Sequence, residues 1–175
     1  NQGRGHDFET ILKTANHLKK YKDIVFLFIG DGSQNQYIRN YVNKAKLHNC
    51  KFIPFQSRKN LSYSLSSADL AIVTLKEGLE GLIAPSKLFG YLSTSIPIVV
   101  ISPVKSYLKE IIEESKSGIW FSNNNSYGLA QWILEIKSDI KQLNIMGKNG
   151  RNYILKNATA DICIGKYKKI FSKYK

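Results

Sequence analysis

The sequence predicts an α/β fold, a doubly wound, Rossmann-like parallel sheet of about six strands flanked by helices, with extra helices toward the C-terminal end. Continuous apolar runs at 24–29 and 97–101 are typical of parallel strands that are buried on both faces. Between such runs, apolar residues recur at three- and four-residue intervals, as on the buried face of a helix. Strands that alternate with helices in this way favour right-handed crossovers and a parallel sheet.

The expected elements follow one another along the chain. Asp7 is placed to cap the first helix, and Pro85 has the fixed φ and missing N–H that suit a first helical turn. We expect strands at 24–29, 51–56, 69–75, 97–101 and 118–121. We expect helices at 8–18, 34–47, 61–68, 85–92, 104–112, 129–136, 140–155 and 159–174. The chain contains no repeat and no low-complexity segment, so a single domain over residues 1–175 is predicted.

The composition is that of an ordinary globular protein, with 43% hydrophobic and 22% charged residues. No apolar run approaches the roughly 20 residues that cross a bilayer, and no signal-peptide pattern opens the chain, so a cytoplasmic location is predicted. Cys50 and Cys163 have a spacing that fits neither a zinc site nor a disulfide framework. Both cysteines are therefore predicted to be buried free thiols, and no metal site is expected.

The formal net charge of +13 has two interpretations. Only Arg4, Arg39, Arg58 and Arg151 among the 26 basic residues are arginines, and no nucleic-acid-binding motif accompanies the charge, so a nucleic-acid partner is not expected. One interpretation is a solvated lysine surface. The other is a basic amphipathic helix at the C-terminal end that rests on anionic lipid headgroups. Its basic and aromatic residues would be Lys166, Tyr167, Lys168, Lys169, Phe171, Lys173, Tyr174 and Lys175.

The stretch 80–92 is expected to bind an anion. The main-chain N–H groups at the start of a helix point outward with the positive end of the helix dipole, and Ser86 and Lys87 add a hydroxyl group and a cation there. A second feature is the turn Gly30-Asp31-Gly32-Ser33 after the strand at 24–29. Ligands of open α/β sheets bind at the carboxyl ends of the strands, so both features are expected at one sheet edge.

The residues at 85–92, Pro-Ser-Lys-Leu-Phe-Gly-Tyr-Leu, and at 96–99, Ile-Pro-Ile-Val, resemble the nucleotide-sugar-binding motif in the C-terminal domain of GT-B glycosyltransferases of family 4. The resemblance covers nearly the whole chain. It implies a donor-binding domain of a two-domain enzyme, whose N-terminal acceptor-binding domain lies outside residues 1–175. It further implies retaining transfer of a sugar from a nucleotide diphosphate, of the UDP-sugar type, to a glycan or lipid-linked acceptor, without a metal or another cofactor.

The resemblance also implies roles for individual residues. In the family, a glycine-containing loop that directly follows the first strand carries basic residues that contact the donor diphosphate, and Phe55 and Gln56 match a loop that borders the base. Arg4 is either such a contact or a solvent-facing loop residue, and Phe55 is either a base contact or a core residue. The residues expected to bind the nucleotide sugar are Arg4, His6, Gly30, Gly32, Phe55, Gln56, Pro85, Ser86, Lys87 and Gly90.

Glu80 is the expected catalytic residue. Many family members carry two glutamates separated by seven residues, of which the first faces the donor sugar and the second binds the ribose hydroxyls. The position that matches the second is Gly90, so this carboxylate contact is absent here. Glu80 is the candidate for the first glutamate, and Glu77 competes with it.

Two functions of other classes remain open. A nucleotide-sugar epimerase would need acid and base groups around the sugar, and His6, His17 and His48 are scattered along the chain. A non-catalytic, flavodoxin-like binding domain would show an acidic cluster or a flavin loop at the sheet edge, where Gly30-Asp31-Gly32 offers one carboxylate. We expect residues 1–175 to bind the donor with little or no turnover.

Overall fold

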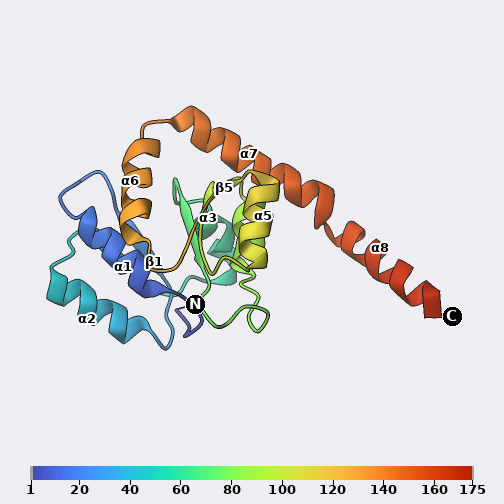
Figure 1. Ribbon diagram of the computed structural model, residues 1–175, viewed down its shortest axis with the longest axis horizontal. Coiled ribbons are helices and arrows are strands. Elements are labelled where there is room, and N and C mark those ends of the chain that lie inside the picture. Colours follow the sequence, from blue (N-terminus) through green and yellow to red (C-terminus); the bar gives the residue numbers. More distant parts are fainter. Residues whose placement is uncertain (1, 175) are drawn as a thin grey trace.

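The structure is a computed structural model that describes residues 2–174 (Figure 1), and it has the predicted alternation of strands and helices. The strands are β1 (Phe26–Ile29), β2 (Cys50–Ile53), β3 (Ala71–Thr74), β4 (Ile98–Ile101) and β5 (Gly118–Phe121). The α-helices are α1 (Phe8–His17), α2 (Asn35–Ala45), α3 (Leu61–Leu65), α4 (Lys87–Ser93), α5 (Tyr107–Ser115), α6 (Ser126–Ile136), α7 (Ile140–Asn157) and α8 (Ala160–Phe171). Short 3-10 helices occur at η1 (Arg58–Asn60) and η2 (Ser172–Tyr174).

The strands form two parallel sheets within residues 2–174, one of β1 and β2 and one in the order β3-β4-β5. The α/β class and the parallel pairing are confirmed, but the strand count of about six was too high. The strands also do not form one sheet within residues 2–174, because β1 and β3 do not pair with each other. Residues of the N-terminal loop lie between their carboxyl ends instead, where Gln2 N donates to Asp31 O and Lys76 N donates to Gly5 O.

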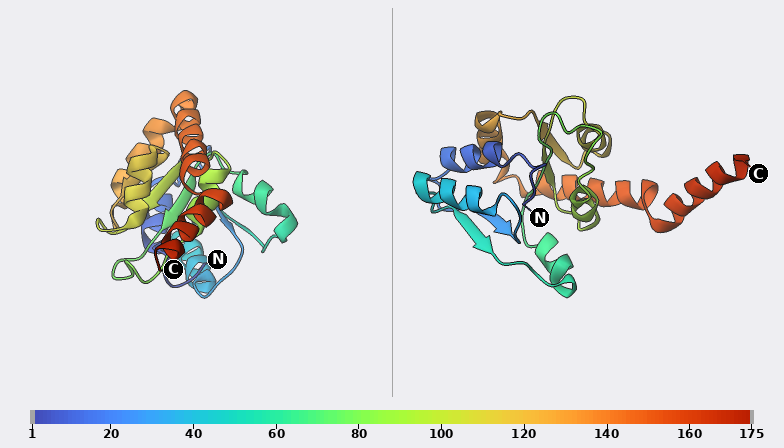
Figure 2. Two further views of the ribbon diagram at one scale, coloured as in Figure 1. Left: turned by 90° about the vertical axis from the view of Figure 1, so that its right-hand side faces the viewer. Right: turned by 90° about the horizontal axis from the view of Figure 1, so that it is seen from below.

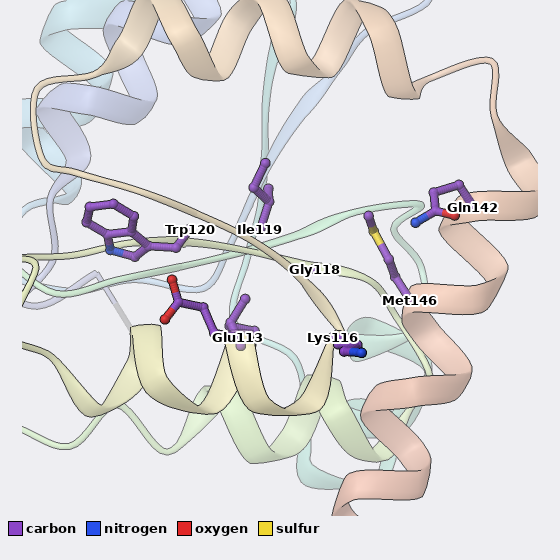
Figure 3. A pocket seen from close by; sticks show the side chains of 8 residues that line it. Glu113, Lys116, Gly118, Ile119, Trp120, Gln142 and Met146 are labelled. Atoms are coloured by element: carbon purple, nitrogen blue, oxygen red, sulfur yellow. The ribbon is translucent and has the colours of Figure 1, made fainter.

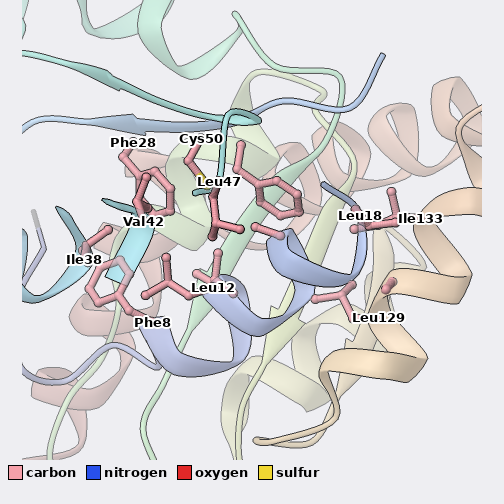
Figure 4. Packing of buried hydrophobic residues seen from close by; sticks show 14 of the residues in the cluster. Phe8, Leu12, Leu18, Phe28, Ile38, Val42, Leu47, Cys50, Leu129 and Ile133 are labelled. Carbon is pink, nitrogen blue, oxygen red and sulfur yellow. The ribbon is translucent and has the colours of Figure 1, made fainter. Parts of the chain in front are cut away.

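Both faces of β4 are covered, which explains its uninterrupted apolar sequence. Val99 and Ile101 pack in a first core cluster, and Ile98 and Val100 pack in a second. The first cluster unites β1, β2 and β4 with α1, α2 and α6, and Figure 4 shows Leu12 of α1 close to residues from α2. The second cluster unites β3 and β4 with residues from α4, α5 and α7. Helices therefore lie on both faces, as in a doubly wound fold.

Some element boundaries differ from the expected ones. Asp7 caps α1 as predicted, because its side chain accepts a hydrogen bond from Thr10 N. The helix expected at 104–112 begins later, at Tyr107, because the Ser106 side chain caps it by accepting from Leu108 N. Cys50 and Cys163 are both free thiols, but only Cys50 is buried, so the expectation of burial was wrong for Cys163.

The helix α8 extends away from the two sheets (Figures 1 and 2), whereas α7 packs against α4, where Gly150 lies close to Leu92. The helix α8 has no buried residue, and its exposed apolar side chains include Ile164, Tyr167, Ile170 and Phe171. No helix within residues 2–174 is long and apolar enough to span a membrane.

Candidate functional site

Three loops that the sequence separates widely meet at the carboxyl ends of β1 and β3. The N-terminal loop 2–7 lies between the turn 30–33 and the segment that follows β3. Gln2 N donates to Asp31 O, and Gln34 N donates to Gln2 O. On the other side, Lys76 N donates to Gly5 O and Asp7 N donates to Thr74 Oγ1. The structure therefore brings the predicted glycine turn, the predicted basic loop and the start of the 75–86 loop together at the carboxyl ends of β1 and β3.

The glycine turn owes its shape to two backbone requirements. Gly30 has a φ of +96°, a conformation that residues with a side chain rarely adopt. A Cβ atom at Gly32 would lie 2.7 Å from main-chain atoms of Gln2, so only glycine allows the two chains to approach so closely. The side chain of Gln2 secures the same contact, because its Nε2 donates to Gly30 O and its Oε1 accepts from Asn35 Nδ2. Both glycines thus shape the turn.

Phe55 extends beyond the end of β2 and lies beside this turn. Its side chain is 82% exposed, so the interpretation of Phe55 as a core residue was wrong. A Cβ atom at Gly30 would lie 4.0 Å from Phe55 Cδ2, so the ring lies beside the glycine turn. Gln56 is half-buried, and its Nε2 donates to Pro54 O. The ring is available for stacking on a flat ligand group.

His6 is half-buried in the N-terminal loop. Its Nδ1 lies 3.1 Å from Thr74 O at the end of β3. Burial lowers the pKa of His6, the nearby Lys87 cation lowers it further, and the hydrogen bond to Thr74 acts in the opposite direction. Lys87 therefore lies close enough to His6 for its charge to act on the imidazole. Arg4 belongs to the same loop and is exposed.

The helix α4 begins beside these groups. Pro85 is buried and Ser86 is exposed at the N-cap position, where its side chain makes no capping hydrogen bond. Leu88 N donates to Pro85 O, so one amide of the first turn is already paired. Lys87 is half-buried, and burial lowers the pKa of its ammonium group. Because α4 has only seven residues, its dipole is small, and side-chain cations carry most of the positive charge at this place.

Gly90 has a packing role in the structure. A Cβ atom at this position would lie 3.3 Å from Leu65 Cδ1, so the glycine allows α3 to approach α4. The contact lies one turn into α4, away from the exposed Ser86.

Glu80 and Glu77 line one cavity of about 370 Å³ at the carboxyl edge of the sheet β3-β4-β5. The other lining residues follow β4 and β5 and are Pro103, Val104, Lys105, Ser122 and Asn123. The choice between the two glutamates therefore remains open, since both face this cavity. The loop that carries Glu80 packs on the N-terminal loop, because a Cβ atom at Gly5 would meet Ile83 Cδ1 at 2.6 Å.

A polar network that was not predicted from the sequence holds the site together. Asp7 accepts hydrogen bonds at Oδ2 from Asn123 Nδ2 and from Thr10 Oγ1. Asn123 Nδ2 also donates to Leu75 O, so the loop after β5 is tied to the end of β3 and to the N-terminal loop. The capping signal of Asp7 is visible in the sequence, but the partners Thr74 and Asn123 come from distant segments. Sequence spacing alone carries no signal for them.

A second cavity, of about 320 Å³, lies elsewhere (Figure 3). It runs between α5, β5 and α7, and its lining includes Glu113, Lys116, Trp120 and Met146. It reaches Gly118, the first residue of β5, whereas the predicted site lies at the carboxyl ends of the strands. No predicted site residue lines it.

The sequence model of the family "Glycosyl transferases group 1" matches residues 5–153, which is most of the chain. The chain belongs to this family. The predicted glycosyltransferase class is therefore confirmed. The family match does not support the epimerase or the flavodoxin-like alternative.

A curated relative of this group 1 chain agrees with that assignment. The chain is 28% identical over 167 residues to the "Probable glycosyltransferase WbjE" of Pseudomonas aeruginosa, which covers 95% of this chain and 41% of WbjE. The chain thus spans less than half the length of this relative.

Two solved structures share the fold of the group 1 chain. TarM of S. aureus matches with a TM-score of 0.80 at 18% identity over 98% of this chain and 33% of TarM. Anabaena HepE, solved in complex with UDP-glucose, matches with a TM-score of 0.75 at 13% identity over 94% of this chain and 44% of HepE. These likenesses confirm the GT-B-type, Rossmann-like fold.

Proposed function

We propose that this group 1 glycosyltransferase chain is a donor-binding domain that holds a UDP-sugar at the edge formed by loop 2–7, turn 30–33 and the start of α4. The observation that carries the proposal is the position of the N-terminal loop, which is hydrogen-bonded to the glycine turn on one side and to the residues after β3 on the other. This arrangement places His6 near Lys87 and the turn near Phe55. The UDP-glucose complex of HepE, which shares the fold, supports a UDP-sugar as the donor.

In this proposal each segment contacts a different part of the donor. Lys87, His6, Arg4 and the main-chain N–H groups near Ser86 face the diphosphate, the turn at Gly30 and Gly32 lets the backbone approach it, and Phe55 with Gln56 borders the base. A charged hydrogen bond contributes about 1.5–3 kcal/mol, so a few such contacts are sufficient for micromolar binding. The same cations stabilise the negative charge that develops on the leaving diphosphate during transfer.

Glu80 is the proposed catalytic residue, with Glu77 as its competitor in the same cavity. A carboxylate at this place faces the donor sugar and interacts with its hydroxyl groups and with positive charge that develops at the sugar ring. The transfer is proposed to retain the anomeric configuration, as in glycosyltransferase family 4, and to need no metal. The acceptor is a glycan or a lipid-linked glycan.

The acceptor-binding domain of the same enzyme is the proposed partner across the site. Exposed apolar side chains surround the start of α4, namely Leu82 at 77%, Ile83 at 39% and Phe89 at 39% exposure. An apolar rim of this kind is typical of a surface that meets another domain.

A cytoplasmic location at an anionic membrane is the second part of the proposal. The apolar side chains of α8 lie on a helix that also carries Lys166, Lys168 and Lys169, which suits contact with anionic headgroups. Binding of residues 1–175 to vesicles with anionic lipid, but not to neutral vesicles, tests this part.

Calorimetric titration of the chain with UDP and UDP-glucose tests the donor site. We expect saturable binding, with uridine bound at least about tenfold more weakly because it lacks the phosphates that Lys87 contacts. Absence of saturable binding of UDP up to about 1 mM would overturn the proposal. The isolated chain is expected to show little or no sugar transfer, because it spans less than half the length of its relative WbjE.

A further inference from the structure

We propose that Asn123 is a positioning residue for sugar transfer, because its side-chain amide joins the two loops that act on the donor. One is the loop 2–7 with the proposed diphosphate contacts, and the other is the loop 75–86 with Glu77 and Glu80. The inference rests on the proposed function and adds to it a role for the segment after β5, which supplies no proposed donor contact.

The Nδ2 atom of Asn123 donates two hydrogen bonds. It lies 2.7 Å from Asp7 Oδ2 and 3.0 Å from Leu75 O. Asp7 is the last residue before α1, and Leu75 directly follows β3. A primary amide carries two N–H donors on one atom, whereas a hydroxyl group carries one and a carboxylate carries none. Among side chains of this size, asparagine is therefore the one that can serve both acceptors.

The Asp7 end of this bridge is connected to His6 through the end of β3. Asp7 is 8% exposed, and its carboxylate also accepts from Thr10 N and Thr10 Oγ1. Its own N–H group donates to Thr74 Oγ1, while Thr74 O lies 3.1 Å from His6 Nδ1. A hydrogen bond to an ionised carboxylate is among the stronger ones in a protein. Displacement of Asp7 would thus move the neighbouring imidazole away from the end of β3.

The Leu75 end of the bridge lies where the chain leaves β3. Leu75 N donates to Ile101 O of β4, and Leu75 O accepts from Asn123. The two glutamates of the loop 75–86 come next and line the 370 Å³ cavity, which Asn123 lines as well. Asn123 therefore holds the segment from which the glutamates depart, and it limits how far this segment can move relative to Asp7.

The turn after β5 does not need the Asn123 side chain for its own shape. Asn125 caps α6, because its side chain accepts a main-chain hydrogen bond from the first turn of that helix. Asn124 has a positive φ of +66°, and its N–H group donates to Thr10 Oγ1. Both hydrogen bonds of the Asn123 side chain go to distant segments instead. The contact between the two loops, and not the turn, therefore explains an asparagine at this position.

Asn49 offers a matched control within the same chain. Its Nδ2 donates to Ala15 O of α1 at 2.9 Å, and the residue is 6% exposed. The Oδ1 atoms of Asn49 and Asn123 are both buried, and neither has a hydrogen-bond partner within residues 2–174. Asn49 lies directly before β2, at its amino end, whereas the proposed donor site lies at the carboxyl ends of the strands. The two residues are alike in burial and bonding but differ in distance from the donor loops.

Calorimetric titration of the full-length enzyme with UDP tests the inference in the variants Asn123→Ser and Asn49→Ser. We expect the Kd for UDP to rise about tenfold or more in Asn123→Ser and to stay within about twofold of the natural value in Asn49→Ser. The melting temperature should fall in both variants, since each loses a hydrogen bond of a buried amide. Weaker UDP binding in Asn123→Ser alone separates positioning from a general loss of stability.

The glutamate loop gives a second readout. The full-length enzyme with UDP-glucose as the donor is expected to release UDP with a kcat at least about tenfold lower in Asn123→Ser, in addition to a raised KM. Asn49→Ser should leave both constants close to the natural values. A raised KM with an unchanged kcat in Asn123→Ser would overturn the part of the inference that concerns the glutamates.

Asn123→Asp provides a pH-dependent readout. The introduced carboxyl group would face Asp7, and the other charged groups around it are the two glutamates and Lys105 of the same cavity. Two ionised carboxylates repel each other, whereas a protonated one can donate a hydrogen bond to the other. UDP affinity of Asn123→Asp, relative to Asn123→Ser, should therefore recover as the pH falls from about 8 to about 5.5. His6 is present in both variants, so its own titration cancels in this ratio.

Three results would overturn the inference. The first is a natural UDP affinity in Asn123→Ser, and the second is an equal loss of affinity in Asn123→Ser and Asn49→Ser, because the effect would then be one of stability. The third is a pH-independent ratio between Asn123→Asp and Asn123→Ser, which would contradict the bridge to Asp7. Failure of the natural enzyme to bind UDP is distinct from these results, because it would overturn the proposed donor site and this inference with it.

Discussion

The imidazole Nδ1 of His6 lies 3.1 Å from the main-chain oxygen of Thr74, the last residue of β3. A carbonyl oxygen can only accept a hydrogen bond, so this contact favours the tautomer with the proton on Nδ1, in which the neutral ring has its acceptor at Nε2. Burial and the charge of Lys87 lower the pKa of His6 and so favour this neutral ring. A bound diphosphate would reverse the effect, because its negative charge stabilises the imidazolium form.

Donor binding is therefore expected to take up a proton at His6. UDP affinity of the natural chain, relative to that of His6→Gln, should rise as the pH falls through the pKa that His6 has in the complex, and should level off below the lowered pKa of the free protein. Calorimetry in buffers of different ionisation enthalpy would detect the additional proton in the natural chain. Identical proton uptake by the two proteins would show that His6 does not contact the diphosphate.

Without a ligand, the lowered pKa of His6 makes the folded chain less stable as the pH falls, whereas UDP affinity rises as the pH falls. The pKa of His6 in the folded chain lies below the ordinary histidine value of 6.5. The neutral form therefore contributes stability that is present above that value and is lost as the pH falls through the lowered pKa. Chemical unfolding of the natural chain and His6→Gln across this range should show a stability difference that shrinks at low pH, and a constant difference would contradict the assignment.

Removal of the Lys87 charge should weaken donor binding. Lys87→Met keeps most of the buried side-chain stem, so the loss should be specific to the ammonium group. We expect the Kd for UDP to rise by roughly 10–150-fold, which corresponds to one charged hydrogen bond. Lys44→Met, at an exposed position in the last turn of α2, is the matched control and should bind UDP as the natural chain does. Similar Kd values of the two variants for UDP would show that the Lys87 ammonium group does not contact the donor.

The glycine turn should tolerate no side chain at Gly32. Gly32→Ala would place a Cβ atom 2.7 Å from the backbone of Gln2, and we expect a loss of roughly 1–3 kcal/mol in the free energy of unfolding. Gly165→Ala is the matched control, because nothing lies within 4 Å of a Cβ atom there. Because Gly165 lies within α8, Gly165→Ala should raise the free energy of unfolding by about 0.5–1 kcal/mol. Denaturant titration measures both values, and an unchanged stability of Gly32→Ala would contradict the close approach.

The two glutamates of the 370 Å³ cavity can be separated by turnover. Glu80→Gln in the full-length enzyme should lower kcat for sugar transfer by about 100-fold or more, with UDP affinity changed little. Glu77→Gln should leave kcat close to that of the natural enzyme. The reverse pattern would assign the role to Glu77, and no effect from either substitution would place the sugar elsewhere.

Much of the fold was predictable because local signals agree with the tertiary structure. The buried run 98–101 became β4 because both of its faces are covered, and Gly118–Phe121 became β5 with the predicted bounds. The number of strands was not predictable in the same way. Strand pairing depends on which segments are present to fill the sheet, and β1 and β3 remain apart in residues 2–174.

In the candidate site too, some residues were predictable from local sequence signals and others were not. The turn at Gly30 and Gly32 was identified from its glycines, since a positive φ and a close approach both demand that residue. Phe55 could not be assigned from the sequence, because an aromatic residue after a strand is compatible with either a core or an exposed position, and the structure exposes it. The partners of Asp7 come from segments 67 and 116 residues away, which no local pattern reveals.

Chemical-shift mapping by NMR with UDP tests the central claim most directly. The account predicts that the amides of His6, Gly30, Gly32 and Lys87 shift together along one binding curve, while Gly118, beside the cavity in Figure 3, does not move. Saturation that leaves those four amides unchanged, or that shifts Gly118 most strongly, would contradict a nucleotide site at the edge between β1 and β3.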